Sequence, residues 1–349
     1  MESATLITVA VICKNEVSNM ARCLESILAS TSHLEVEVLV VDSYSTDGTV
    51  ELAQKYPVTI IQLGYDWPHS PAAGRYTAVL HAKGRYLLLI DGDMELIPGF
   101  IEKALAQMEV NPEVVAVRGR LHNFHKINGD TIHVNSKFAK TTSAKERCQE
   151  DTPELITCAS GSALFRLIAI REAGNFQPFL KAEEEYEIAQ RLRTRGGKLL
   201  YIPVDAVNHY GYLPDPLREV GRRLRRGLVG GVGQMIRLSF QEGYGWENFH
   251  RFRLQLVLGC FSLLFIPAVL FAWVWPPVPL IWLSLSLIFL ITYWVKKRDL
   301  RSAFAACLLN VLIGIDIIRG ALISVPPREA YPTTVTMING TFVNQEGVN

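Results

Sequence analysis

Asp91 and Asp93 stand one residue apart at the end of an apolar run, residues 86–90, that has strand character. In an α/β sheet, ligands gather at the carboxyl ends of the strands. Two carboxylates there repel each other unless a cation lies between them, and Mg²⁺ and Mn²⁺ favour carboxylate and phosphate oxygens. Asp-Gly-Asp also occurs as a polar turn after a strand. The segment therefore indicates either such a turn or a divalent-metal site shared with a phosphorylated substrate.

Two more acids follow predicted strands: Glu16 lies just beyond residues 6–13, and Asp42 directly follows residues 36–41. If these strands end at one edge of a parallel sheet, a single crevice collects the carboxylates. Ribose hydroxyls and base N–H groups donate to carboxylates, whereas a diphosphate needs a metal, so the crevice suits a nucleotide. Because no G-x-G-x-x-G or G-x-x-x-x-G-K-[ST] motif follows a strand, we expect metal and side chains to hold the pyrophosphate.

The elements that must position these acids alternate along the chain. The predicted strands are residues 6–13, 36–41, 58–63 and 86–90, and the predicted helices are residues 17–29, 46–56 and 71–83. Their alternation predicts an α/β fold, with a largely parallel, Rossmann-like sheet that is covered by helices on both faces. Such a sheet buries its strands on both sides, which explains their nearly continuous apolar character.

Length and composition limit the classes of protein. The 349 residues are enough for a catalytic domain and an appendage, and a net charge of +1 gives no indication of a nucleic-acid partner. The six cysteines form no C-x-x-C pair, so the sequence suggests neither a zinc site nor a disulfide framework. We expect no cleaved signal peptide, because no basic segment followed by a long apolar stretch begins the sequence.

The composition becomes membrane-like at about residue 254. Residues 254–275 and 278–295 contain no charged side chain, and each run is long enough to cross a hydrocarbon core of roughly 30 Å. Prolines between them predict a membrane hairpin, with a buried helix pair as the alternative. Residues 302–324 carry Asp316 and Arg319, so spanning the bilayer, lying in its interface and packing on the hairpin all stay open.

Basic residues flank both charge-free runs. By the positive-inside rule, these flanks and the large N-terminal domain lie in the cytoplasm, so we expect an integral protein of the plasma or inner membrane. The interpretation divides the chain into four parts: a cytoplasmic catalytic domain over residues 1–215, basic interfacial helices over 216–253, the hairpin and a third membrane or interfacial helix over 254–325, and a tail over 326–349.

Taken together, the motifs resemble the family 2 glycosyltransferases of the GT-A fold. They occur in the family's order over residues 6–210: Asn15-Glu16 after the first strand, Asp42 to Thr49 like D-x-x-S-x-D-G-T, Arg75 on a helix before the D-x-D-like Asp91-Gly92-Asp93, Ser160-Gly161-Ser162, the acidic run Glu183-Glu184-Glu185, and His209 after a further strand. The resemblance implies an inverting enzyme that uses a nucleotide-diphosphate sugar, a UDP-sugar before other classes, with Mn²⁺ or Mg²⁺ as cofactor.

The resemblance also implies a role for each matching residue. The implied donor-binding residues are Glu16, Asp42, Arg75, Asp91 and Gly161, with Asp42 at the base and Arg75 at the phosphates. Asp93 would bind the cation, with Asp91 at its water shell and His209 completing the coordination, although a surface histidine is the alternative reading of His209.

The candidate base departs from the family's pattern. The family has Glu-Asp with the aspartate as base, whereas this chain has three consecutive glutamates, and the best register makes Glu185 the base and Glu184 the alternative. A charged first turn that complements the helix dipole is the structural alternative. One carboxylate opposite the leaving group suffices for inversion.

Two further regions bear on the acceptor. Residues 122–157 are poorly patterned, and we interpret them as an acceptor-binding insertion, a lid or a surface loop. Residues 217–226 carry five arginines, which either rest on anionic lipid or, through Arg222 and Arg226, bind a phosphate of the donor or of a lipid acceptor. The Q-x-x-R-W motif of processive synthases is absent, because Gln234 is followed by Met-Ile-Arg-Leu.

The sequence therefore predicts a membrane-anchored, metal-dependent, inverting glycosyltransferase with a lipid-linked or envelope-glycan acceptor. One alternative is a polyprenyl-phosphate hexosyl synthase, whose acceptor is already anionic and needs no base. The other is a catalytically silent membrane scaffold that binds nucleotide sugars. Membrane lipids are expected partners, and the sugar, the acceptor and the oligomeric state stay open.

Overall fold

The computed structural model describes residues 7–127, 130–134, 152–159, 161–212, 215–320 and 322–339. The chain forms two compact units, which are described separately. Unit 1 comprises residues 1–179, 184–213 and 327–349, and unit 2 comprises residues 180–183 and 214–326. The chain therefore leaves unit 1 for four residues and returns to it at the glutamates that the sequence marks as candidate bases.

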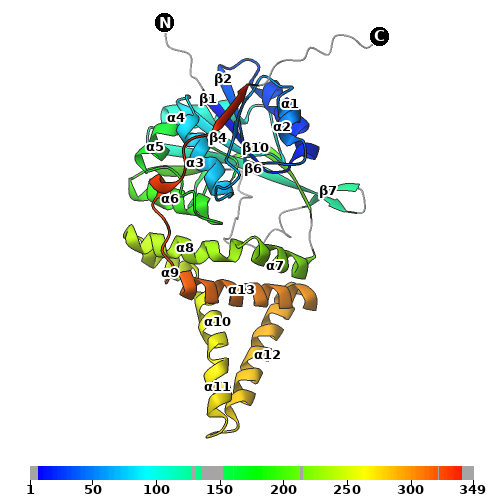
Figure 1. The fold of residues 1–349 in the computed structure, drawn as a ribbon, viewed down its shortest axis with the longest axis vertical. Helices are drawn as coiled ribbons and strands as arrows, with labels where there is room; N and C mark the ends of the chain where they lie inside the picture. The colour runs from blue at the N-terminus through cyan, green and yellow to red at the C-terminus, as the bar shows by residue number, and fades with distance from the viewer. Residues whose placement is uncertain are drawn as a thin grey trace. The chain divides into compact units, whose positions relative to one another are not determined.

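Unit 1 is built on a mixed sheet with helices on both faces (Figure 1). Its strands are β1 (Ile7–Cys13), β2 (Val36–Asp42), β3 (Thr59–Gln62), β4 (Tyr86–Asp91), β5 (Met94–Leu96), β6 (Val114–Ile127), β7 (Asp130–Val134), β8 (Glu154–Leu155), β9 (Ala163–Arg166), β10 (Lys198–Tyr212) and β11 (Thr336–Asn339). Its helices are α1 (Val17–Thr31), α2 (Thr49–Ala53), α3 (Pro71–His81), α4 (Phe100–Val110), α5 (Leu167–Glu172) and α6 (Glu184–Thr194), with a 3₁₀ turn η1 (Arg328–Ala330).

The strand order is β11-β3-β2-β1-β4-β9-β6-β10-β5, with β7 on β6 and β8 on β10. The four predicted strands, β1 to β4, run parallel to one another, as the sequence predicts. The later strands β5, β9 and β11 pair antiparallel, so the sheet as a whole is mixed. The parallel part brings the carboxyl ends of β1, β2 and β4 to one edge.

Both faces of the sheet are buried, which accounts for the apolar strands. Along β1, Val9 and Val11 pack into the core on one face, while Ala10 and Ile12 pack into the core on the other. This alternation follows from the two-residue period of a strand. Every residue of β1 is buried, so the strand carries no solvent-facing side that would need polar residues.

Two predicted boundaries require correction. Helix α2 is shorter than the predicted 46–56, because Gly48 has a left-handed φ of 93° and Asp47 accepts a hydrogen bond from the Thr49 backbone N–H at 3.0 Å. The poorly patterned region 122–157 contributes to the sheet through the end of β6, β7 and β8. Residues 128–129 and 135–151 of that region lie outside the described residues.

The residues after 326 belong to unit 1. Strand β11 pairs antiparallel with β3, and Tyr331 is 1% exposed. The Tyr331 ring meets Trp67, Tyr76 and Phe179 edge-on, with ring centres 5.6–5.7 Å apart. Four aromatic rings of this size bury substantial apolar area. This segment, for which the sequence suggested no chemistry, therefore closes one edge of the sheet.

Unit 2 consists of helices: α7 (Pro216–Arg225), α8 (Leu228–Gln241), α9 (Gly245–Arg251), α10 (Arg253–Leu263), α11 (Phe265–Phe271), α12 (Val278–Lys297) and α13 (Leu300–Gly320). Among the described residues, three helical stretches are long and apolar enough to cross a membrane: Arg253–Phe271, Val278–Lys297 and Leu300–Gly320. The first two form the predicted hairpin, and α13 lies across its open end, alongside α7 and α8 (Figure 1).

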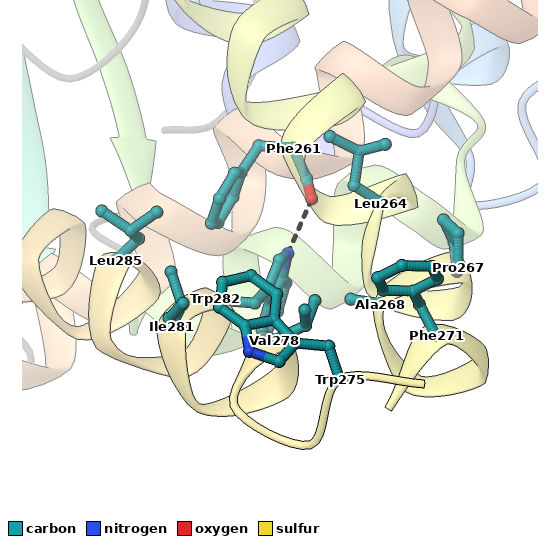
Figure 2. Close-up of a pocket in the computed structure, with 10 residues that line it drawn as sticks. All are labelled: Phe261, Leu264, Pro267, Ala268, Phe271, Trp275, Val278, Ile281, Trp282 and Leu285. Atoms are coloured by element: carbon teal, nitrogen blue, oxygen red, sulfur yellow. Dashed lines mark hydrogen bonds between the residues drawn. The ribbon is translucent and has the colours of Figure 1, made fainter. Parts of the chain in front are cut away.

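Contacts inside the hairpin are aromatic. The Trp282 indole N–H donates to the Phe261 carbonyl at 2.8 Å, and the two rings stack with centres 5.3 Å apart. Figure 2 shows these residues at an apolar cavity of about 450 Å³ between the two arms of the hairpin. The lining of this cavity, which includes Trp275 and Leu285, presents hydrocarbon and indole surface. Such a surface is compatible with the interior of a bilayer.

Glycines let α13 pack closely on two neighbouring helices. A Cβ at Gly314 would lie 1.8 Å from the Gln255 carbonyl oxygen of α10, and a Cβ at Gly320 would lie 2.4 Å from Gly233 of α8. Small residues at helix crossings permit this backbone approach, as they do in membrane bundles. The two crossings fix α13 against α8 and α10.

Candidate active site

The strand ends bring the predicted acids to one edge of the sheet. In the parallel registers, Cys13 of β1 pairs with Asp42 of β2, and Ile12 pairs with Asp91 of β4. Asp42 and Asp91 therefore flank the end of β1. Between Asp91 and Asp93, a Cβ at Gly92 would lie 2.9 Å from the Cβ of Cys13, so this close approach requires the central glycine of Asp-Gly-Asp.

Asp42 is fully buried and is held by groups of the protein. Its carboxylate accepts hydrogen bonds from the Ser45 backbone N–H at 2.9 Å, from the Ser45 hydroxyl, and from the Gln62 amide at 3.1 Å. Its exposed fraction is 0%. These contacts fix the loop after β2. The contact with a nucleobase that the resemblance implies for Asp42 stays a prediction.

His209 and Asp93 come together through the pairing of β10 with β5. The two strands are antiparallel, with His209 opposite Met94, and the Tyr210 N–H donates to the Asp93 carbonyl at 2.9 Å. As a result, His209 Nε2 lies 3.2 Å from Asp93 Oδ2, although the two residues are 116 positions apart. The histidine that the sequence singled out therefore faces the second aspartate of the motif.

Asn123 of β6 determines which ring nitrogen of His209 faces Asp93. The His209 Nδ1–H donates to Asn123 Oδ1 at 2.9 Å, because an amide oxygen can only accept. In the neutral ring, Nε2 then carries a lone pair that faces the Asp93 carboxylate. Two acceptors at 3.2 Å need a proton or a cation between them. A neutral imidazole whose other nitrogen is held by a hydrogen bond is the usual form of a metal-ligating histidine.

The charges around this edge favour a cation. Burial lowers the pKa of His209, but its hydrogen bond to Asp93 and the nearby charges of Asp93, Asp91 and Glu16 outweigh burial and raise it above the ordinary value. Burial raises the pKa of Asp91, with Arg75 opposing and Asp93 adding to the shift. Burial likewise raises the pKa of Glu16, and nearby acids add to it. In all three cases the neighbouring carboxylates contribute to the raised pKa.

The residues present fit a hard divalent cation that is shared with a substrate. Within the described part of the chain, no three His, Cys, Asp or Glu side chains lie close enough to hold a metal by themselves. Asp93 and His209 provide two donors, and Asp93 Oδ1 is buried without a hydrogen-bond partner among the described residues. Mg²⁺ and Mn²⁺ sites of this kind use one or two protein ligands and complete their coordination with phosphate oxygens and water.

Arg75 of α3 connects the aspartate motif to the acidic run before β10. The guanidinium is 2% exposed, and it donates to Asp91 at 3.0 Å, to Glu184 at 2.9 Å and to Glu185 at 2.8 Å. The three carboxylates in turn raise the pKa of Arg75, although burial opposes them. Gly74 allows this reach, because a Cβ there would lie 2.6 Å from the Ile12 side chain of β1. Arg75 therefore acts as the shared counter-ion of three acids.

Gly161 lies at the centre of this cluster. A Cβ at position 161 would lie 2.9 Å from Glu185 Oε1, 3.0 Å from Arg75 Nη2 and 3.0 Å from Asp91 Oδ2. Any side chain there would force the three charged groups apart. The sequence placed Gly161 among the donor-binding residues, and the structure brings it against Arg75, Asp91 and Glu185.

The two candidate bases differ in accessibility. The side chain of Glu184 is 9% exposed, whereas that of Glu185 is 30% exposed. Both are in the first turn of α6, which begins after Glu183 in a left-handed conformation with φ of 64°. A base must reach the proton that it removes. Of the two, Glu185 presents its carboxylate to solvent beside the aspartate motif.

Sequence reasoning missed Asn123 and the partners of Arg75. Neither has a local signal: Asn123 meets His209 only through the parallel register of β6 with β10, and Arg75 meets Glu184 across 109 positions. In unit 2, the Arg222 guanidinium donates to Glu219 at 2.6 and 2.7 Å, whereas Arg226 is the C-cap residue that follows α7 and is exposed.

Residues 8–173 match the family model described as Glycosyl transferase family 2. This part of the chain is therefore similar to the family that the motifs predict, and the mixed α/β sheet is like that of GT-A glycosyltransferases.

Two curated relatives and one solved structure are similar to this chain. An uncharacterized glycosyltransferase of Haemophilus influenzae is 28% identical over 184 residues, which span 51% of this chain and 58% of the relative. A TPR repeat-containing protein of Synechococcus elongatus is 24% identical over 225 residues, which span 64% of this chain and 47% of the relative. The chain thus spans about half the length of these curated relatives.

The crystal structure of S. aureus TarS 1-349 in complex with UDP-GlcNAc superposes with a TM-score of 0.50 at 15% identity, covering 90% of this chain and 91% of that one. This likeness concerns the fold alone.

Proposed function

We propose that the protein is a metal-dependent, inverting glycosyltransferase that moves a sugar from a nucleotide-diphosphate donor to a lipid-linked or envelope-glycan acceptor. One observation carries the proposal. Asp93 Oδ2 and Nε2 of the Asn123-oriented His209 lie 3.2 Å apart, and Arg75 holds both Asp91 of the aspartate motif and Glu185. The Arg75 guanidinium therefore connects the aspartate motif, where we expect a diphosphate to bind, to the candidate base Glu185.

Each group has a definite task in this reaction. Asp93 and His209 would hold Mn²⁺ or Mg²⁺, which offsets the negative charge that develops on the departing diphosphate. Glu185 would accept the proton of the acceptor hydroxyl as that oxygen attacks the anomeric carbon. Arg75 donates a hydrogen bond to Glu185 at 2.8 Å and so fixes the position of that carboxylate beside the aspartate motif. Attack opposite to the leaving group inverts the anomeric carbon.

A UDP-sugar is the donor that we propose, consistent with the UDP-GlcNAc complex of TarS, which shares the fold. The nucleotide would lie along the ends of β1, β2 and β4, near Glu16 and Asp42. Identity of the sugar is left to experiment.

We also propose that the hairpin of α10–α11 and α12 anchors the chain in a membrane, with the catalytic domain in the cytoplasm. Lys296 and Lys297 end α12, Arg253 begins α10, and Arg251 precedes it. Basic residues therefore lie at both chain ends of the hairpin, opposite its tip. Helix α13 crosses the open end of the hairpin, where its charged Asp316 and Arg319 are ordinary for an interfacial helix (Figure 1). An anchored enzyme suits an acceptor that is itself held in the bilayer.

Thermal-shift screening of the detergent-solubilised full chain tests the donor site. UDP-, GDP-, CMP- and dTDP-sugars are compared with and without Mn²⁺, for the wild type, Asp93→Ala and Glu113→Gln. Glu113 is the control, because it is 45% exposed and pairs with Lys198 at the start of β10, far along the strand from His209. A bound ligand at a hundredfold excess over its Kd stabilises the fold by about 2.7 kcal/mol. We expect a Mn²⁺-dependent shift with one nucleotide class in the wild type and Glu113→Gln, and none in Asp93→Ala; equal shifts in all three variants would contradict the proposed site.

A further inference from the structure

We propose that a pocket within unit 2 binds a lipid-borne phosphate. The pocket has a volume of about 410 Å³ and is formed by α7, α8, α13 and the segment that precedes α6. Its lining combines two cations, one carboxylate, one amide, three glycines and five aliphatic side chains: Lys181, Arg319, Asp316, Gln234, Gly227, Gly230, Gly320, Leu224, Val229, Leu312, Ile315 and Ile323. This composition differs from the wholly apolar cavity of the hairpin.

The two cations of the pocket, Lys181 and Arg319, favour binding of an anion. Lys181 and Arg319 come from different elements, both are exposed, and neither forms a salt bridge to any residue in the described part of the chain. Asp316, the single carboxylate of the lining, interacts electrostatically with Arg319, so the pocket has a net charge of +1 by formal count and Lys181 supplies the excess cation. A tetrahedral phosphate offers several oxygens that two separate cations can share, and charge-assisted hydrogen bonds of this kind are the stronger class.

The aliphatic side chains of the lining favour binding of a hydrocarbon chain. Leu312 and Ile315 belong to α13, which is apolar enough to lie in a membrane, and Ile323 follows it. A soluble phosphate would leave this surface in contact with water. A phosphate ester attached to a lipid covers it, and the burial of apolar area contributes roughly 25 cal/mol per Å². The combination of cations and aliphatic groups therefore favours an amphiphile over a free anion.

Two further groups of the pocket lack a partner. Asp316 Oδ2 and Gln234 Oε1 are buried without a hydrogen-bond partner among the described residues. Buried acceptors of this kind carry a free-energy penalty until they receive a donor. A phosphate that is esterified to a hydroxylated group, such as a sugar or a glycerol, supplies such a donor.

The walls of the pocket are held by close contacts. A Cβ at Gly231 would lie 2.5 Å from the Ala182 backbone nitrogen, so α8 packs directly on the segment that carries Lys181. The same segment is fixed by Glu183, which pairs with Arg251 of α9 at 3.2 Å. Because these contacts involve backbone and an ion pair, the position of Lys181 does not depend on the occupant.

Two sources can supply a lipid-borne phosphate: an anionic phospholipid of the bilayer, or the phosphate of a lipid-linked acceptor. The assignment to the acceptor rests on the proposed function, whereas the phosphate site itself does not. Lys181 precedes the candidate base Glu185 by four residues in the chain. We infer that the acceptor is the occupant.

Gly230 offers a way to fill the pocket without disturbing its walls. A Cβ there would meet only the Asp316 carboxylate, at 3.8 Å, which is ordinary van der Waals contact. Gly230→Leu places a side chain in the pocket and raises the helix propensity of α8. Gly221→Leu on α7 is the matched control, because a Cβ at Gly221 meets nothing within 4 Å.

The test is native mass spectrometry of the full chain with added undecaprenyl phosphate glucose (a lipid phosphate that is esterified to a sugar), phosphatidylglycerol or phosphatidylcholine. We expect bound undecaprenyl phosphate glucose in the wild type and Gly221→Leu. We expect at least a tenfold weaker affinity in Gly230→Leu and in the double variant Lys181→Gln, Arg319→Gln. Preference for undecaprenyl phosphate glucose over phosphatidylglycerol supports the acceptor assignment, and equal binding of the two overturns it in favour of a membrane-lipid site.

Binding that is equal in all variants, or that does not distinguish phosphatidylcholine from the anionic lipids, overturns the phosphate site. Because no donor or metal is added, this outcome is independent of the donor test above. Thermal shifts with UDP-sugars on the same variants show whether each still folds and binds its donor, so loss of lipid binding alone is assigned to the pocket.

Discussion

Replacing Arg75 with Met removes the guanidinium that three carboxylates share. Arg75 is 2% exposed, and its partners Asp91, Glu184 and Glu185 lie within 3.0 Å of it. Removing one partner of a buried ion pair typically costs about 3–5 kcal/mol, because the remaining charge is left uncompensated. For a domain of this size, roughly 2–4 °C of Tm corresponds to each kcal/mol. We therefore expect the apparent Tm of Arg75→Met to fall by about 6–20 °C at pH 7.5.

The loss should depend on pH in a definite direction. Without the guanidinium, the clustered carboxylates gain protons in the folded state, so the folded chain binds more protons than the unfolded chain. Stability then rises as pH falls, and the difference in Tm between Arg75→Met and the wild type should shrink between pH 7.5 and pH 5.5. Burial already raises the pKa of Asp91 in the wild type, which makes it the first group expected to protonate.

Differential scanning fluorimetry of the purified full chain across this pH range is the assay. Arg85→Met is the matched control, because Arg85 is 59% exposed and its pair with Glu109, at 3.4 Å, is an exposed one. Exposed pairs contribute at most about 1 kcal/mol. A Tm of Arg75→Met within about 2 °C of the wild type, or a difference that grows at lower pH, would refute the assignment of Arg75 as the shared counter-ion.

Three further predictions concern the same edge of the sheet. Glu185→Gln should reduce transfer by about 10²–10⁴-fold while donor affinity stays within a fewfold; unchanged turnover in a coupled nucleotide-release assay would favour the synthase that needs no base. Asn123→Ala should weaken Mn²⁺ affinity by about 10–100-fold, measured by calorimetry with UDP present, and an unaltered affinity would disprove its orienting role. The metal-free protein should lose stability as pH rises from about 4, because Asp91 and Glu16 have raised pKa values in the folded state; a Tm that increases over pH 5–8 would contradict these shifts.

The sequence was informative where function follows from strand ends. Asp42, Asp91 and Asp93 lie where the alternation of apolar runs predicted, because parallel strands deliver their ends to one edge. The apolar character of β1 follows from burial on two faces, and the central glycine of Asp-Gly-Asp follows from its close approach to Cys13 at the end of β1. The two charge-free runs, residues 254–275 and 278–295, could also be predicted as helices of membrane-spanning length, because the thickness of the bilayer sets that length.

The unpredicted parts depend on register and on long-range packing. Asn123 reaches His209 only because β6 and β10 pair in one register, and no local pattern specifies that register. Strand β11 has no amphipathic signal, yet it completes the sheet beside β3. The course of α13 is set by Gly314 and Gly320, whose close contacts involve backbone atoms of other helices. A single sequence does not reveal which helix a glycine will meet.

Transfer of label from a radioactive UDP-sugar to the lipid fraction of membranes that contain the protein tests the central claim most directly. The wild type, Asp93→Ala and Glu113→Gln are compared with EDTA, and with EDTA followed by excess Mn²⁺. The account predicts label in the lipid fraction for the wild type and Glu113→Gln, which EDTA abolishes and Mn²⁺ restores, and no label for Asp93→Ala. Transfer that persists in EDTA or in Asp93→Ala would contradict a metal-dependent glycosyltransferase built on Asp93 and His209.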